Sequence, residues 1–151
     1  MMKAKSLPLV VQLMLLRKHI PEGRGQIGAS RKGRQLRWFQ AIRPHVLGAV
    51  YQIELQYAEG HRPLVLVISP DLQALAGKRK LPHTFREVNG KPSLCLWFRG
   101  DWDFSQPVAT TVIPWAAEWF WFFEHWLVTG EWLGGGRHDT PITPPEQSVA
   151  I

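Results

Sequence analysis

Residues 113–127 read IPWAAEWFWFFEHWL, an apolar run dense in aromatic side chains that decides how the rest of this 151-residue chain is interpreted. Pro114 suits the first turn of a helix, and Gly130 suits a helix end. We therefore predict one long aromatic helix over residues 113–128. A helix of this kind needs a large apolar surface to cover, and an antiparallel sheet supplies one.

The same helix has nearly the length of a membrane span. Glu118, Glu124 and His125 argue against insertion, because a charge at the centre of a bilayer costs about 2.5–3.5 kcal/mol on insertion scales. We expect Glu118 and Glu124 to face solvent or to meet basic partners, since an unpaired buried carboxylate is too costly to keep ionised.

The segments before this helix have the pattern of strands. Apolar residues occupy every second position from Tyr51 to Tyr57, which is typical of a sheet with one solvated face. Turn-forming residues separate the runs, so we predict an α+β fold built on a four-stranded antiparallel meander. The four predicted strands are Leu36–Ile42, Ala49–Tyr57, Leu64–Ile68 and Ser93–Phe98.

The N-terminal apolar run is predicted to form an amphipathic helix over residues 7–19. Leu9, Leu13, Leu16 and Ile20 fall on one helical face. Arg17-Lys18-His19 stands where a signal peptide would carry its small-residue cleavage site, so we expect no secretory signal. The glycine-rich, basic residues 22–35 that follow are predicted to form a loop.

Length and cysteine content limit the class of protein. We expect a single domain over residues 1–139 followed by a proline-rich tail, residues 140–151. The one cysteine, Cys95, excludes an internal disulfide framework and a multi-thiolate zinc site, which favours a reduced, cytoplasmic protein. The six histidines show no spacing typical of metal ligands, so we expect no metal and no cofactor.

Charge is unevenly distributed along the chain. Residues 1–50 hold ten Lys and Arg against one acid, whereas residues 51–151 hold eight against eleven. The run 31–34, followed by Arg37-Trp38-Phe39, offers cations for phosphates and rings for stacking. We favour a solvated basic loop that leads into a strand with core aromatics, because no recognised nucleic-acid motif accompanies the run. The glycine pattern of residues 23–28 lacks the preceding strand of a dinucleotide site, and we interpret it as a flexible loop.

Cys95 lies in the run Leu94-Cys95-Leu96-Trp97-Phe98, where a cysteine is usually an inert core residue. Strand alternation places Leu94, Leu96 and Phe98 on one face, with Cys95 and Trp97 on the other. If the leucine face meets the helix, Cys95 need not be buried.

Several motifs resemble those of ubiquitin-conjugating enzymes, in which a cysteine on a strand is followed by a Trp, a Pro and a helix. A closer resemblance is to the ubiquitin-conjugating-like protein of type II CBASS, a bacterial cyclic-oligonucleotide anti-phage system. The resemblance covers about residues 81–139, and its motifs are Pro82-His83, Leu94-Cys95-Leu96, Gly100-Asp101-Trp102-Asp103, residues 113–119 and residues 129–138.

The resemblance implies a transferase with the ubiquitin-conjugating (UBC-like) fold, in which Cys95 forms a thioester. The acyl group is expected to be the C-terminus of a neighbouring cGAS-like nucleotidyltransferase, and conjugation would prime that enzyme for cyclic nucleotide signalling. No ATP-using activating domain fits this length, so either another protein activates the acyl group or the donor is processed in an unusual way. A thiol of ordinary pKa would suffice for this chemistry.

The resemblance also implies roles around the cysteine. His83 would polarise the thioester carbonyl or carry a proton, His138 would approach Cys95 from the loop after the helix, and Trp102 would wall the cysteine groove. Eukaryotic relatives place an Asn after His-Pro, whereas this chain reads Pro82-His83-Thr84 with no such amide. A non-catalytic binding protein of the same fold and a basic nucleic-acid-binding module remain the alternatives.

Overall fold

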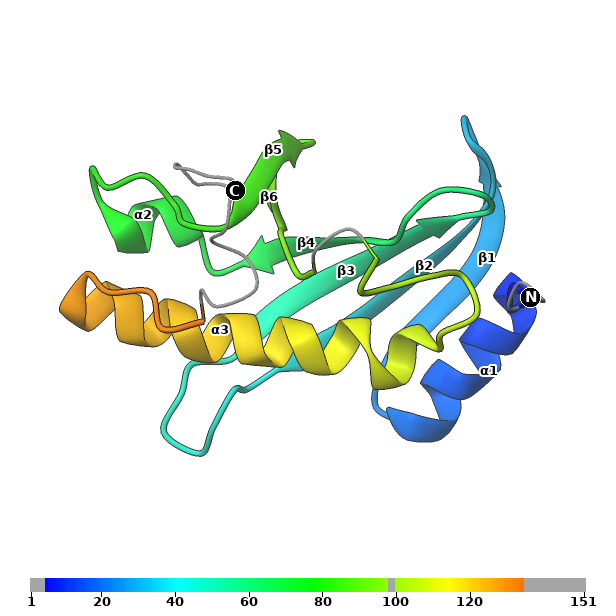
Figure 1. The fold of residues 1–151 in the computed structure, drawn as a ribbon, viewed down its shortest axis with the longest axis horizontal. Helices are drawn as coiled ribbons and strands as arrows, with labels where there is room; N and C mark the ends of the chain where they lie inside the picture. Colours follow the sequence, from blue (N-terminus) through cyan, green and yellow to red (C-terminus); the bar gives the residue numbers. More distant parts are fainter. Residues whose placement is uncertain (1–4, 98–99, 135–151) are drawn as a thin grey trace.

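The computed structural model describes residues 5–97 and 100–134, in which helix α3 lies across a six-stranded antiparallel sheet and α1 packs beside it (Figure 1). This arrangement confirms the predicted α+β class and the two predicted helices. The elements are α1 (Leu9–His19), β1 (Arg24–Ser30), β2 (Gly33–Ile42), β3 (Tyr51–Ala58), β4 (Leu64–Ser69), α2 (Leu72–Ala76), β5 (Thr84–Val88), β6 (Lys91–Leu94), a 3₁₀ turn η1 (Val108–Thr110) and α3 (Val112–Thr129).

The sheet has two strands more than the predicted meander. Its order is β1-β2-β3-β4-β6-β5, so β6 lies between β4 and the edge strand β5. Strand β5 lies outside the four predicted strands; Asn89 and Gly90, with φ of 52° and 76°, join it to β6. Asn-Gly between two short polar and apolar runs is a hairpin signal.

The predicted loop over residues 22–35 is wrong, because this segment forms β1 and the start of β2. Two of its glycines, Gly23 and Gly25, serve close packing. A Cβ on Gly23 would lie 2.1 Å from the Trp38 ring, and one on Gly25 would lie 2.7 Å from it. Trp38 is fully buried, so β1 can cross over its indole only where side chains are absent.

Helix α1 presents the predicted face to the core, with Leu9, Leu13 and Leu16 buried. Its one amide side chain is also buried: Gln12 Nε2 donates to the Gln106 carbonyl (3.0 Å), and its Oε1 accepts from the Val108 N–H (2.9 Å). These two bonds join the first helix to the turn before α3.

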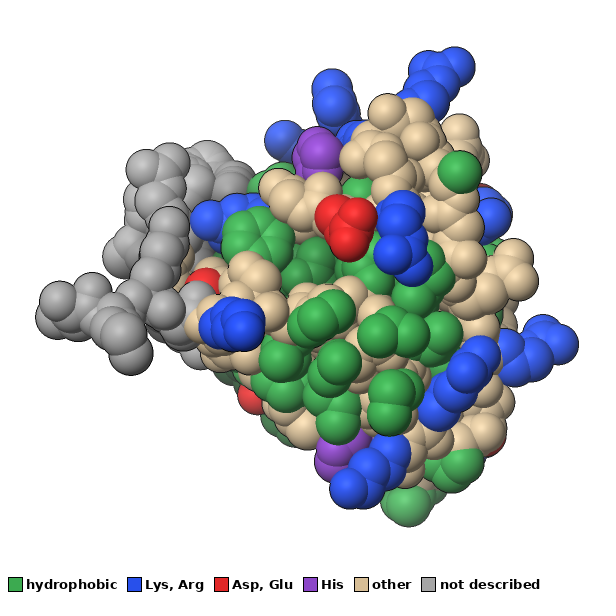
Figure 2. Space-filling view, turned by 90° about the vertical axis from the view of Figure 1, so that its right-hand side faces the viewer, with side chains coloured by type: hydrophobic (Ala, Val, Ile, Leu, Met, Phe, Trp, Pro, Cys, Tyr) green, Lys and Arg blue, Asp and Glu red, His purple; other side chains and the backbone are tan. Residues whose placement is uncertain are grey.

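The outer face of α1 is apolar as well. Val10 is 53% exposed and Met14 is 62% exposed, while the basic residues 17–19 end the helix. Figure 2 shows this side of the molecule, where hydrophobic side chains gather and Lys and Arg side chains border them.

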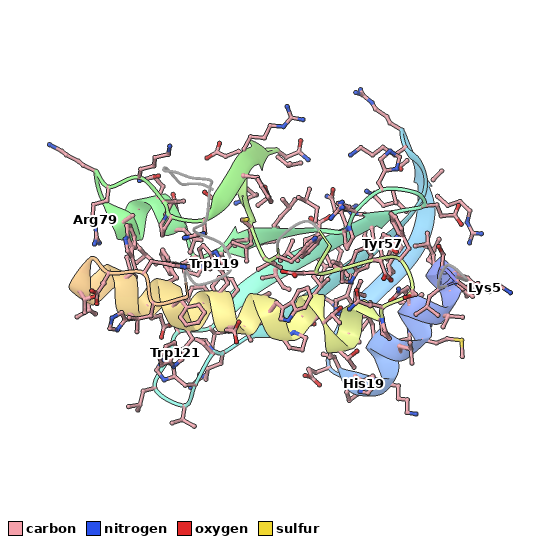
Figure 3. The ribbon with its side chains drawn as sticks, viewed as in Figure 1. Lys5, His19, Tyr57, Arg79, Trp119 and Trp121 are labelled. Carbon is pink, nitrogen blue, oxygen red and sulfur yellow. The ribbon has the colours of Figure 1, made fainter. Side chains whose placement is uncertain are left out.

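Helix α3 buries its aromatic residues against the sheet. Phe120 stacks on Tyr51 with ring centroids 4.0 Å apart, and Phe123 stacks on Trp119 at 5.2 Å. Figure 3 shows Trp119 and Trp121 leaving the helix on opposite sides, in agreement with their exposed fractions of 3% and 44%. Among the described residues, no helix combines the length and apolar character needed to cross a membrane.

The two glutamates of α3 behave as predicted. Glu118 is exposed. Glu124 is half-buried and accepts hydrogen bonds from His45 Nε2 (2.8 Å), the Ala49 N–H (2.9 Å) and the Tyr51 hydroxyl (2.8 Å). Burial, together with the bond to Glu124, raises the pKa of Tyr51. Glu124 thereby holds the β2–β3 loop on α3.

Replacing Phe123 by Ala should lower the free energy of unfolding by about 3–5 kcal/mol, because a fully buried ring leaves a cavity. Trp121→Ala, two residues earlier on the exposed side, should cost less than about 1 kcal/mol. Urea denaturation of both variants measures the difference, and equal losses would contradict the orientation of α3.

Glu124→Ala should destabilise the protein by about 1–3 kcal/mol, because it leaves a partly buried hydroxyl and a backbone N–H without their acceptor. Glu118→Ala on the same helix removes an exposed carboxylate and should change stability by less than about 0.5 kcal/mol. Thermal denaturation of the two variants checks this, and equal melting temperatures would contradict the structural role given to Glu124.

Candidate active site

Cys95 immediately follows β6, which ends at Leu94 rather than extending to Phe98 as predicted. Its N–H donates to the carbonyl of His83 (3.0 Å), the residue that precedes β5. Leu94, Cys95 and Leu96 are all buried, and Cys95 is 7% exposed. The simple alternation expected for a strand therefore fails here, because the chain leaves the sheet at the cysteine.

His83 is the second residue that defines the site. Its φ of 47° lies in the left-handed region, where His is one of the more tolerated residues. Its carbonyl also accepts a hydrogen bond from Trp119 Nε1 on α3 (3.0 Å). The imidazole ring stacks on Trp132, with centroids 4.8 Å apart and an interplanar angle of 23°. His83 thus connects the cysteine, α3 and the segment that follows α3.

A small cavity lies between Cys95 and α3, bordered by His83, Trp115, Glu118, Trp119 and Trp132. Its volume is about 20 Å³. That is room for about one water molecule. Two ionisable side chains, His83 and Glu118, share this lining with the thiol. The structure therefore brings the predicted pair of Cys95 and His83 together in one enclosed space.

The thiol does not have the ordinary pKa that was expected. Burial raises the pKa of Cys95 from 9.0 to about 11. At pH 8 this corresponds to about one thiolate per thousand molecules, compared with about one in ten for a thiol of pKa 9. The native thiol is consequently a weak nucleophile while its surroundings stay closed.

Trp102 does not line this cavity. It is 3% exposed, donates its indole N–H to Thr111 Oγ1 (3.2 Å) and packs edge-on against Tyr57 at 5.8 Å. These contacts place it in the core, so its proposed role as the wall of the cysteine groove gains no support from the geometry. His138 and the tail of residues 140–151 lie outside the described residues, and their roles stay predictions.

The walls of the cavity come instead from Trp115 and Trp119 on α3 and from Trp132 after it. Sequence reasoning placed the first two in the helix core and missed the third. Trp132 belongs to the motif of residues 129–138 that carries the family resemblance, but the motif gave it no role. Within residues 5–97 and 100–134, no group of three or more His, Cys, Asp or Glu side chains could hold a metal ion.

Comparison with known families identifies the chain. A model of the type II CBASS E2 protein family matches residues 12–139. The chain belongs to this family. No curated protein matches it. As a CBASS E2 protein it is an anti-phage, ubiquitin-conjugating-like protein, and family membership accounts for its UBC-like fold of N-terminal helix, antiparallel sheet and long C-terminal helix.

The basic hairpin of this CBASS E2 protein is not wholly available to a nucleic acid. Arg31, Lys32 and Arg34 are exposed around the β1–β2 turn. Arg37 is bound to Glu54 (2.7 Å) and lies over the Phe39 ring at 5.3 Å. The ion pair raises the pKa of Arg37 and leaves one cation fewer for phosphate contacts.

Alkylation of the native CBASS E2 protein should follow the raised thiol pKa. The rate with iodoacetamide should rise about tenfold per pH unit from pH 8 to 10 and level off near pH 11, whereas the urea-unfolded chain should level off near pH 9. Because folding raises this pKa, the contribution of the Cys95 thiol to the free energy of unfolding is complete below about pH 9 and is lost as the pH approaches 11. A native profile that levels off near pH 9 would contradict the burial.

Proposed function

We propose that Cys95 accepts an activated acyl group as a thioester and transfers it to an amine, and that the acyl group is the C-terminus of a cGAS-like nucleotidyltransferase. The observation that carries this proposal is the place of the chain's one cysteine. It lies at the end of β6 against α3, beside His83, in a member of the type II CBASS E2 family.

The chemistry has two balanced steps. The Cys95 thiolate attacks the carbonyl carbon of an activated C-terminal acyl donor, such as a thioester on another protein, and a sulfur–carbon bond forms while the donor's leaving group departs with its electron pair. An amine then attacks the Cys95 thioester, an amide forms, and the sulfur leaves as thiolate while the nitrogen releases a proton. The free energy that drives the transfer comes from the activated acyl donor, so the chain needs no ATP site.

His83 is the residue best placed to assist. Its ring lines the same cavity as the thiol, so it is proposed to carry a proton or to polarise the thioester carbonyl. The backbone N–H of Cys95 is already bonded to the His83 carbonyl and is not free to donate to an oxyanion. His138 stays a second candidate proton carrier.

The test uses cells that express this protein and the nucleotidyltransferase together. A covalent complex of the two should appear on gels without reductant and disappear with it. Cys95→Ala should abolish the complex, with a melting temperature close to that of the wild type. Cys95→Ser should give less complex, but as an oxygen ester that reductant leaves intact. Val128→Ala, 86% exposed at the end of α3, is the matched control and should behave as the wild type.

The shielded thiol favours a second candidate function, that of a non-catalytic UBC-like binding partner. In that case the protein would bind the nucleotidyltransferase without any covalent complex. The wild type and Cys95→Ala would then give the same result, with no covalent complex and no difference in the modification of the partner. That result in the co-expression experiment would replace the acyl-transfer proposal with the binding one.

A further inference from the structure

The chain reverses direction directly after α3 and runs back along the helix, as the orange trace in Figure 1 shows. The helix ends at Gly130, whose φ is 79° and whose N–H donates to the Trp126 carbonyl (2.8 Å). The Glu131 N–H then donates to Thr129 Oγ1 (3.0 Å), which fixes the start of the returning segment. We call residues 130–134 the strap.

Trp132 is the residue by which the strap covers the cysteine. Its ring centroid lies 4.8 Å from that of His83, 5.4 Å from that of Trp119 and 5.8 Å from that of Phe122. Two of these neighbours also fix the cysteine, because the His83 carbonyl accepts hydrogen bonds from both Trp119 Nε1 and the Cys95 N–H. The indole of Trp132 thus packs on the two residues that hold Cys95 in place and helps to line the cavity beside the thiol.

Gly134 seats the other end of the strap. A Cβ at this position would lie 2.2 Å from the Phe122 ring, so only glycine lets the backbone approach α3 this closely. Leu133, between Trp132 and Gly134, is 49% exposed and does not border the cavity. The strap thus has one residue that faces the thiol, one that faces solvent and one that permits contact with the helix.

The closed strap leaves too little space for reaction. A cavity of about 20 Å³ holds about one water molecule, whereas an acyl group on the Cys95 sulfur and an attacking amine need several times that volume. The closed state also carries a penalty, because the buried Trp132 indole N–H has no hydrogen-bond acceptor among the described residues. An unsatisfied buried donor makes opening less costly than the aromatic contacts alone would suggest.

We propose that the strap is a gate over Cys95, with Trp132 as its shielding residue, and that the thiol reacts only when the strap has moved off α3. The burial of the thiol is then a property of the closed strap rather than of the fold as a whole. Its importance for acyl transfer rests on the proposed function, while the shielding itself does not.

The test exploits the single thiol and needs no partner protein. The rate of reaction of Cys95 with 5,5′-dithiobis(2-nitrobenzoate) is measured for the wild type, Trp132→Ala and the matched control Leu133→Ala. Loss of the Trp132 contacts with three neighbouring rings should speed the reaction by about tenfold or more, because opening of the strap then no longer has to break them. Leu133→Ala should react within about twofold of the wild type, and Trp132→Phe should recover most of the protection.

Gly134→Ala is an independent variant, since it keeps Trp132 and pushes the strap away from Phe122. It too should speed the reaction. The gate is refuted if Trp132→Ala and Gly134→Ala both react at the wild-type rate, or if Leu133→Ala speeds the reaction as much as Trp132→Ala. A reaction speeded by Trp132→Ala in a protein that forms no covalent complex in cells would refute acyl transfer and leave the gate in place.

Discussion

One carbonyl oxygen organises the region around the cysteine. The His83 carbonyl accepts hydrogen bonds from the Cys95 N–H and from Trp119 Nε1, so it joins the end of β6 to α3. Without this junction, the chain leaving the sheet at Leu94 would have no fixed relation to the helix. The imidazole on the same residue lies in the cavity beside the thiol, which means that the position of a candidate proton carrier and that of a nucleophile depend on the same backbone group.

The surroundings of the thiol keep it unreactive. Apolar rings and leucines desolvate the sulfur, and this lowers the thiolate fraction at neutral pH about a hundredfold below that of a thiol of pKa 9. A conjugating protein that acts only on a chosen partner benefits from such an arrangement, because small electrophiles and oxidants also need the thiolate. Under the proposed acyl transfer, a donor would have to move the strap before it could react with the thiol.

The sequence predicted elements whose pattern is local and missed those that depend on distant partners. The aromatic helix follows from an apolar run bounded by Pro114 and Gly130, the strand from Tyr51 follows from periodicity, and the resemblance located Cys95 and His83. Strand β1 was missed because its glycines are typical of loops, whereas Gly25 is needed there for close approach to the buried Trp38 ring. The contact of Trp132 with His83 was also missed, because it depends on a chain reversal after α3 that the spacing of residues does not predict.

The buried Gln12 side chain has a consequence for the order of folding. Its partners, Gln106 and Val108, lie 94 and 96 residues further along the chain. At a synthesis rate of about 5–20 residues per second, the Gln106 carbonyl and the Val108 N–H leave the ribosome roughly 5–20 s after the first helix. In that interval the leucines of α1 have β1 and β2 to pack against but lack the cover that the turn before α3 provides.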